Sequence, residues 1–234
     1  MPKVEFKYDI FKDEWNMLRV LTLPPTFDKN DTARTQKGID VSLVEQVNNT
    51  KDYYDKQFLI ADFVVNKFLP ANQEFIKKQV EIFQQRWSKI NGTYFQRLGE
   101  ILNIKISTDN LYTAFLTQAG SCPFNTRESW FMVRINDEDV NNVVCHEIMH
   151  IEFERAYGMY CRNLGLPVNL FEDTREALTT LLNEEMSDIL PHPDYGYKEH
   201  QELREEIKKL WNKEKDLKYL LDKINANFQI MNYE

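Results

Sequence analysis

The most informative segment of the sequence reads VVCHEIMHIEF and runs from Val143 to Phe153. It contains the pattern His-Glu-x-x-His, in which His146 and His150 are four residues apart. On an α-helix this spacing puts both imidazoles on one face, one turn apart, where they can hold one zinc ion. The other residues are mostly apolar, so the helix is expected to be buried, and buried histidines need partners. The stretch therefore predicts a buried helix that carries a zinc site.

The predicted helix is long and offers a catalytic base beside the first histidine. It begins after a cap at Asn136-Asp137 and runs to about Asn163, because Gly and Pro residues follow. Glu147 can reach a water on the metal as general base. Cys145 points to another face of the helix and is expected to be a thiol of the core.

Catalytic zinc usually has three protein ligands, and the helix supplies only two. Downstream, 26 residues after His150, the chain reads Glu176-Ala177-Leu178-Thr179. With these two motifs the chain resembles the gluzincins, the thermolysin-like zinc metallopeptidases, over about Tyr112 to Leu190. In that family a second helix, antiparallel to the first, supplies a Glu in such a setting. The resemblance implies that His146, His150 and Glu176 hold Zn²⁺.

The residues themselves leave the third ligand open. Glu172 lies one turn earlier on the same predicted helix face. Glu184 and Glu185 become competitive if the first helix runs to Asn163, because the return helix then reaches the zinc later. The chain also departs from the family at Thr180, where gluzincins carry an Asp that orients a metal-binding histidine.

The resemblance further implies a Tyr or His that stabilises the oxyanion of the transition state. Tyr197 and His200 are the candidates, since they follow the Glu-bearing helix and share one face of a helix start with Arg204. Tyr195 and His192 are the alternatives.

Thermolysin-like enzymes also bind the substrate backbone along an antiparallel edge strand above the helix. Gly120–Phe124 is expected to be that edge, and Tyr112–Gln118 is the alternative. An ordinary sheet edge without substrate contact stays open as a third interpretation.

The remaining pattern predicts an α+β chain of zincin-like type, with a small mixed sheet, an active-site helix, a Glu-bearing helix and extra N-terminal helices. One domain is expected over residues 1–234, with a helical portion at about 1–102 and a catalytic core at about 103–234. The helices before the sheet are expected to cover the site or narrow its cleft. The expected elements are a strand near Val4–Ile10, a loop at Thr26–Gly38, helices at Val41–Leu69 and Asn72–Leu102 separated by a stop or kink at Pro70, strand segments at Ile104–Ile106, Tyr112–Gln118 and Trp130–Ile135, and helices at Glu172–Leu190 and Lys198–Asn225.

Charge and composition exclude several classes of function. The chain of 234 residues has 29 Lys and Arg against 37 Asp and Glu, a net charge of -8, which disfavours nucleic acid and anionic membranes as partners. Three cysteines form no paired framework. No signal peptide and no apolar run of membrane-spanning length is evident, so a cytoplasmic location is expected.

These observations favour a zinc-dependent metallopeptidase that acts on peptides or proteins, with Glu147 as general base. One alternative is a non-catalytic zinc-binding module of the same fold that acts through protein partners. A helical scaffold without metal is the other. The oligomeric state does not follow from the sequence.

Overall fold

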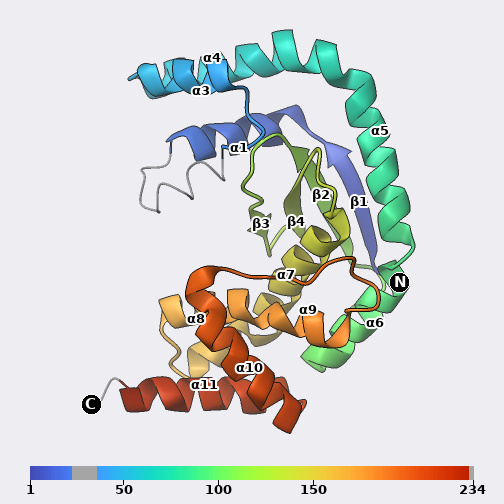
Figure 1. Cartoon of the computed structure of the whole chain (residues 1–234), viewed down its shortest axis with the longest axis vertical. Helices are drawn as coiled ribbons and strands as arrows, with labels where there is room; N and C mark the ends of the chain where they lie inside the picture. Colours follow the sequence, from blue (N-terminus) through green and yellow to red (C-terminus); the bar gives the residue numbers. More distant parts are fainter. Residues whose placement is uncertain (23–35, 232–234) are drawn as a thin grey trace.

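The computed structural model describes residues 1–22 and 36–231, and its fold is α+β with a small mixed sheet, as predicted (Figure 1). Most of the predicted loop Thr26–Gly38 lies outside the described residues. Within them, no helix combines the length and the apolar character that crossing a membrane requires. The elements are β1 (Lys3–Tyr8), α1 (Ile10–Thr22), α3 (Val41–Asn49), α4 (Tyr53–Phe63), a π-helical segment (Val64–Phe68), α5 (Leu69–Ser88), α6 (Asn91–Leu102), β2 (Leu111–Thr117), β3 (Phe124–Asn125), β4 (Trp130–Arg134), α7 (Val140–Asn163), α8 (Val168–Leu178), α9 (Thr180–Glu185), a 3₁₀ turn (Lys198–His200), α10 (Gln201–Lys213) and α11 (Leu217–Met231).

The four strands form one sheet in the order β1-β2-β4-β3. β1, β2 and β4 are parallel, and the short β3 pairs antiparallel with β4 at the edge. β1 belongs to this sheet because Val4 pairs with Tyr112 across more than a hundred residues of chain. The predicted segment Ile104–Ile106 forms no strand.

Helix α7 packs against one face of the sheet (Figure 1), and buried hydrogen bonds fix it there. The Tyr94 hydroxyl of α6 donates a 2.7 Å hydrogen bond to the Cys145 carbonyl, and the Tyr112 hydroxyl of β2 donates a 2.8 Å bond to Glu152. Cys145 itself is buried in the core, as expected. Because these partners sit on two other elements, the register of α7 against the sheet is set along its length.

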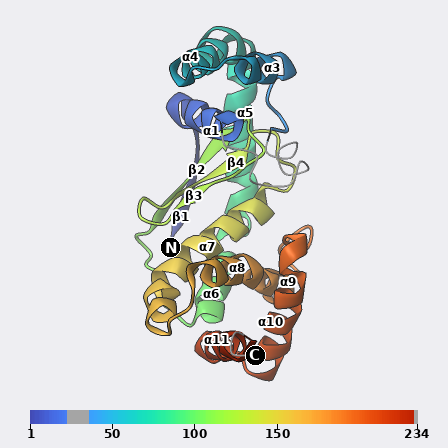
Figure 2. The ribbon, with the colours of Figure 1, turned by 90° about the vertical axis from the view of Figure 1, so that its left-hand side faces the viewer.

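The opposite face of the sheet carries α1. Its Trp15 packs edge-on against Trp130 of β4 with ring centroids 6.0 Å apart, and the Lys12 ammonium lies 4.0 Å from the Trp130 ring centroid. Helices α3 and α4 pack onto α1 rather than onto α7, which Figures 1 and 2 both show. The expectation that the N-terminal helices cover the site is therefore wrong for α1, α3 and α4, because the sheet lies between them and α7.

Several long helices predicted from periodicity are divided in the structure. In the first, Asp52 interrupts the run by accepting hydrogen bonds from the backbone N–H groups of Tyr54 and Asp55, which caps α4. Pro70 then lies in the first turn of α5, directly after the π-helical segment Val64–Phe68, and the chain bends sharply there (Figure 1). The predicted kink is thus confirmed.

The C-terminal predictions need the same correction. The helix expected at Glu172–Leu190 begins earlier, at Val168, and divides into α8 and α9. The helix expected at Lys198–Asn225 divides into α10 and α11 because Asp216 accepts a 2.7 Å bond from the Tyr219 N–H and caps α11. Helix α1 was not predicted.

Candidate metal centre

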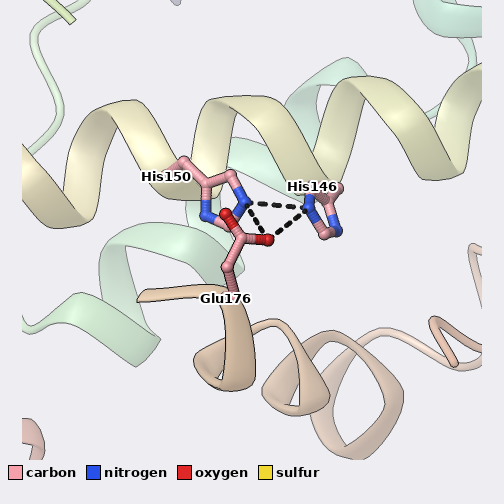
Figure 3. A group of neighbouring side chains, drawn as sticks. All are labelled: His146, His150 and Glu176. Atoms are coloured by element: carbon pink, nitrogen blue, oxygen red, sulfur yellow. Dashed lines mark hydrogen bonds and ion pairs between the residues drawn. The ribbon is translucent and has the colours of Figure 1, made fainter. Parts of the chain in front are cut away.

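Three side chains that could hold a metal ion converge between α7 and α8 (Figure 3). The Nε2 atoms of His146 and His150 face each other at 2.8 Å. A carboxylate oxygen of Glu176, Oε2, lies 3.3 Å from the His150 nitrogen and 3.6 Å from the His146 nitrogen. The group is buried to half-buried, so the donors are shielded from most of the solvent.

Helical geometry explains the pair of histidines, whereas tertiary packing brings in the glutamate. His146 and His150 share one face of α7, and Glu176 comes from the C-terminal half of α8. Helix α7 does run to Asn163, which was the condition under which Glu184 or Glu185 would compete for the third position. It is nevertheless Glu176 that faces the histidines.

The three rival acids lie elsewhere among the described residues. None of Glu172, Glu184 and Glu185 belongs to the group of converging donors. The carboxylate of Glu185 instead accepts hydrogen bonds from Trp211 and Lys215, both at the C-terminal end of α10 or just beyond it. The division of the predicted helix into α8 and α9 separates Glu184 and Glu185 from the helix that carries Glu176.

The spacing of the three donor atoms fits a tetrahedral ion. With metal–ligand distances of about 2.0–2.2 Å, two ligands of a tetrahedral zinc are roughly 3.3–3.5 Å apart. The observed separations of 2.8, 3.3 and 3.6 Å bracket that range. The two facing nitrogens cannot both carry a proton at 2.8 Å, so a cation between them satisfies both lone pairs and the carboxylate together.

The protonation states of the three side chains without metal show which proton a metal ion must displace. Burial and the neighbouring positive His146 lower the pKa of His150 to about 4, so this imidazole is neutral. Burial alone would lower the pKa of His146, but hydrogen bonds to Asp194 and Glu176 outweigh it and raise that pKa to about 10. Burial would also raise the pKa of Glu176, yet the two histidines hold it well below its usual range. A metal ion at this site therefore replaces a proton on His146.

Asp194 is the functional residue that the sequence did not reveal. Its Oδ2 atom lies 2.6 Å from His146 Nδ1, the ring nitrogen that points away from Glu176. This carboxylate fixes the imidazole ring and leaves Nε2 free to bind. In the gluzincin pattern an Asp one turn after the Glu has this task, and here that position is Thr180. The chain thus supplies the orienting carboxylate from the loop after α9, 18 residues beyond Glu176.

A network of buried polar groups holds Asp194 in place. The Arg204 guanidinium of α10, only 3% exposed, lies 3.1 Å from the second carboxylate oxygen of Asp194. The Asn183 side chain of α9 donates a 2.8 Å hydrogen bond to the Asp194 carbonyl and accepts a 2.7 Å hydrogen bond from the Asp194 N–H. Gly196 has a φ of +60°, and a Cβ there would lie 2.6 Å from an Arg204 nitrogen. The loop therefore needs glycine to keep Arg204 against Asp194.

Glu147 is buried next to His146, with 7% of its surface exposed. Burial raises its pKa to about 8, and the charge of Glu176 adds to the rise, whereas His146 and Arg175 oppose it. Burial is thus the main cause that favours the protonated form of this carboxyl group in the metal-free site.

The predicted oxyanion donors lie after the loop that carries Asp194. The His200 ring nitrogen Nε2 is 3.1 Å from the Asp173 carboxylate of α8, and the Tyr197 ring packs edge-on against the His200 ring. Tyr195 is exposed, and His192 is exposed beside Asp139 of the α7 cap. A role in oxyanion stabilisation stays a prediction for Tyr197 and His200.

The sheet edge nearest the metal centre is β3. The Phe124 ring lies 5.3 Å from the His150 ring, centroid to centroid. The predicted edge Gly120–Phe124 thus overlaps the observed edge strand at Phe124. The alternative Tyr112–Gln118 is wrong as an edge, because β2 lies between β1 and β4.

Replacing Asp194 by asparagine is expected to weaken zinc binding about 10- to 100-fold, the usual cost of losing an outer-shell carboxylate. The amide cannot accept a charge-assisted bond from His146, so the imidazole loses its orientation. Competition with a fluorescent zinc chelator measures the affinity. Asp222→Asn on the exposed face of α11 is the matched control, since Asp222 pairs only with Tyr160 among the described residues. Equal affinities for the two variants would contradict the role assigned to Asp194.

The chain matches no protein-family model, no curated protein and no solved structure. The functional assignment therefore rests on the side chains of the metal centre and on the elements that position them. Their donor types, spacing and burial are the observations from which it is drawn.

Proposed function

We propose that this protein is a zinc-dependent metallopeptidase with a gluzincin-like site. The observation that carries the proposal is the convergence of His146, His150 and Glu176 within 4.8 Å, beside a buried Glu147. Two imidazoles and one carboxylate are a donor set that catalytic zinc uses in peptidases. Asp194 bonds the second ring nitrogen of His146 and so supplies the hydrogen-bond partner that orients a histidine ligand in such sites.

In the proposed reaction His146, His150 and Glu176 would hold the zinc ion. When bound, zinc polarises the scissile carbonyl and lowers the pKa of the attacking water. Glu147 takes a proton from that water and passes it to the leaving amine. Glu147 is buried directly beside the ligand His146, which places its carboxyl group for this transfer.

The arrangement of the sheet supports the same proposal. A zincin-like fold needs an edge strand beside the active-site helix, along which a peptide can lie in extended form. β3 is antiparallel to its neighbour, and Phe124 at its start contacts His150. A peptide paired with β3 would therefore pass next to the metal centre.

A structural zinc site is the less favoured interpretation. Such sites are usually closed by four protein ligands, often cysteines. Within the part of the chain that the structure describes, the converging donors are three, and Cys145 is packed in the core. An open fourth position favours catalysis over a purely structural role.

The proposal is tested by metal analysis combined with a hydrolysis assay on a mixture of unstructured peptides. We expect about one zinc ion per chain, cleavage of peptide bonds, loss of cleavage after treatment with a chelator, and recovery when zinc is returned. Zinc without cleavage would instead indicate a non-catalytic zinc-binding module that acts through protein partners. Absence of metal and of cleavage would indicate a scaffold.

A further inference from the structure

A pocket of about 700 Å³ opens beside the metal centre, between β3 and the second half of α7. It is lined by Phe124 and the following turn, by Glu154 and Arg155 of α7, and by Arg175 of α8. Phe124 also contacts His150. Glu154 lies four residues after His150, which is about 6 Å along the helix. If the scissile bond of a peptide lies at the metal, the side chain of the neighbouring peptide residue can therefore reach the pocket.

The pocket is rich in arginine although the protein as a whole is acidic. Arg127, Arg155 and Arg175 line it, whereas the chain has a net charge of -8. Arg155 is already paired, because it lies 2.7 Å from the buried carboxylate of Glu152 and also bonds the Thr126 carbonyl. Among the lining residues, three arginines face one acid, Glu154. Glu152 and Glu176, outside the lining, bond Arg155 and Arg175, so Arg127 is the lining arginine without an acidic partner among the described residues.

Arg175 directly precedes the candidate ligand Glu176, so it is the lining arginine that lies beside the metal centre in sequence. Its guanidinium lies 5.0 Å from the Phe124 ring centroid, and its side chain is 17% exposed. Its acidic neighbours lie at long bonding distances: Glu176 Oε1 accepts a 3.4 Å hydrogen bond, and Glu154 lies 3.9 Å away. Its Nε is buried, and no described residue accepts a bond from it. A half-buried guanidinium whose bonds to acids are long can bind a further carboxylate strongly.

From this geometry we infer that the pocket binds one carboxylate of the substrate, next to the bond that is cleaved. The inference rests on the proposed peptidase function and gives its substrate class as peptides with an acidic group at that position. The carboxylate is either an Asp or Glu side chain or the free C-terminus of the peptide. A carboxylate would supply the acidic partner that Arg127 lacks and a closer partner for Arg175.

Binding of synthetic peptides tests the inference without relying on turnover. The probes are blocked hexapeptides in which one Glu or one Gln is moved through each position, and a neutral peptide made with either a free or an amidated C-terminus. Dissociation constants are measured by calorimetry with the Glu147→Gln protein, so that cleavage does not consume the probe. We expect the acidic member of one pair to bind about tenfold more tightly than its neutral partner. A preference for Glu over Gln at one position would identify the bound carboxylate as a side chain. A preference for the free over the amidated C-terminus would identify it as the C-terminal carboxylate.

Variants of the pocket then assign the preference to its residues. Arg175→Gln is expected to bring the ratio of the two dissociation constants close to one. Arg127→Gln, at an exposed position, is expected to lower the ratio severalfold. Glu154→Gln is expected to raise the ratio, because it removes the acid that lines the pocket and competes for Arg175. Arg162→Gln, at an exposed position at the end of α7, is the matched control and leaves the ratio unchanged.

The outcomes separate this inference from the proposed function. If peptides are cleaved but no pair differs in affinity, or if Arg175→Gln and Arg127→Gln both leave the ratio unchanged, the carboxylate pocket is wrong and the peptidase stands. If acidic peptides bind with an Arg175-dependent preference but are never cleaved by the wild-type protein, the pocket stands and the peptidase is wrong.

Discussion

Replacing His150 by alanine is expected to leave the protein without stoichiometric zinc. Structural zinc sites bind with roughly 10–16 kcal/mol over four ligands, so one ligand contributes about 3 kcal/mol or more, which is about 100-fold or more in affinity. Here three donors converge among the described residues, and the remaining pair, His146 and Glu176, would make a two-ligand site. Zinc content after dialysis, measured by atomic emission, gives the result directly. His146→Ala is expected to behave in the same way.

The chain provides a matched control for this experiment. His192 is 61% exposed at its side chain and lies beside Asp139, away from the converging donors, so His192→Ala should retain full zinc content. His150 is buried, so circular dichroism must first show that the His150→Ala protein is folded. Stoichiometric zinc in a folded His150→Ala or His146→Ala protein would contradict the assignment of these residues as ligands.

Replacing Glu147 by glutamine is expected to preserve zinc and to lower the rate of peptide hydrolysis by about 10²–10⁴-fold. The amide can still hydrogen-bond a water, but it cannot accept the proton that the reaction releases. The substitution keeps the size of a side chain that is buried beside His146, so packing should change little. Zinc content and kcat/KM, measured on the same preparation, check both halves of the prediction.

Glu172 supplies the comparison for Glu147. It is an exposed acid on α8, one turn before Glu176, and it lies outside the converging group. Glu172→Gln should therefore keep both the zinc and the activity. Near-normal turnover by the Glu147→Gln protein would remove Glu147 from the role of base, whatever the metal content.

The local part of the site could be predicted from the sequence, because a helix fixes the relation between residues four apart. His146 and His150 needed only a helical pattern around them. The approach of Glu176 depends on how α8 returns toward α7, and helical rise alone could not choose it over Glu184 or Glu185. Asp194 could not be found at all, since no spacing rule links a loop after α9 to a ring nitrogen on α7.

The fold could be predicted from the sequence to about the same extent as the candidate site. Alternating apolar residues located β1, and short runs rich in β-forming residues located β2 and β4, but the parallel pairing of β1 with β2 is a long-range contact that no local pattern encodes. The divided helices were predictable in principle, because Asp52 and Asp216 are capping residues inside the helical runs. A prediction from apolar periodicity misses these breaks, because the apolar spacing continues on both sides of each capping residue.

The brevity of β3 has a consequence for inhibitor design. This edge strand spans only Phe124–Asn125, so an extended ligand can form very few main-chain bonds along it. Lengthening a peptide-like inhibitor would add ordering cost faster than it adds contacts. For the proposed enzyme, a small rigid compound that joins a zinc-chelating group to a carboxylate arm, set to reach Arg175, is the better starting scaffold.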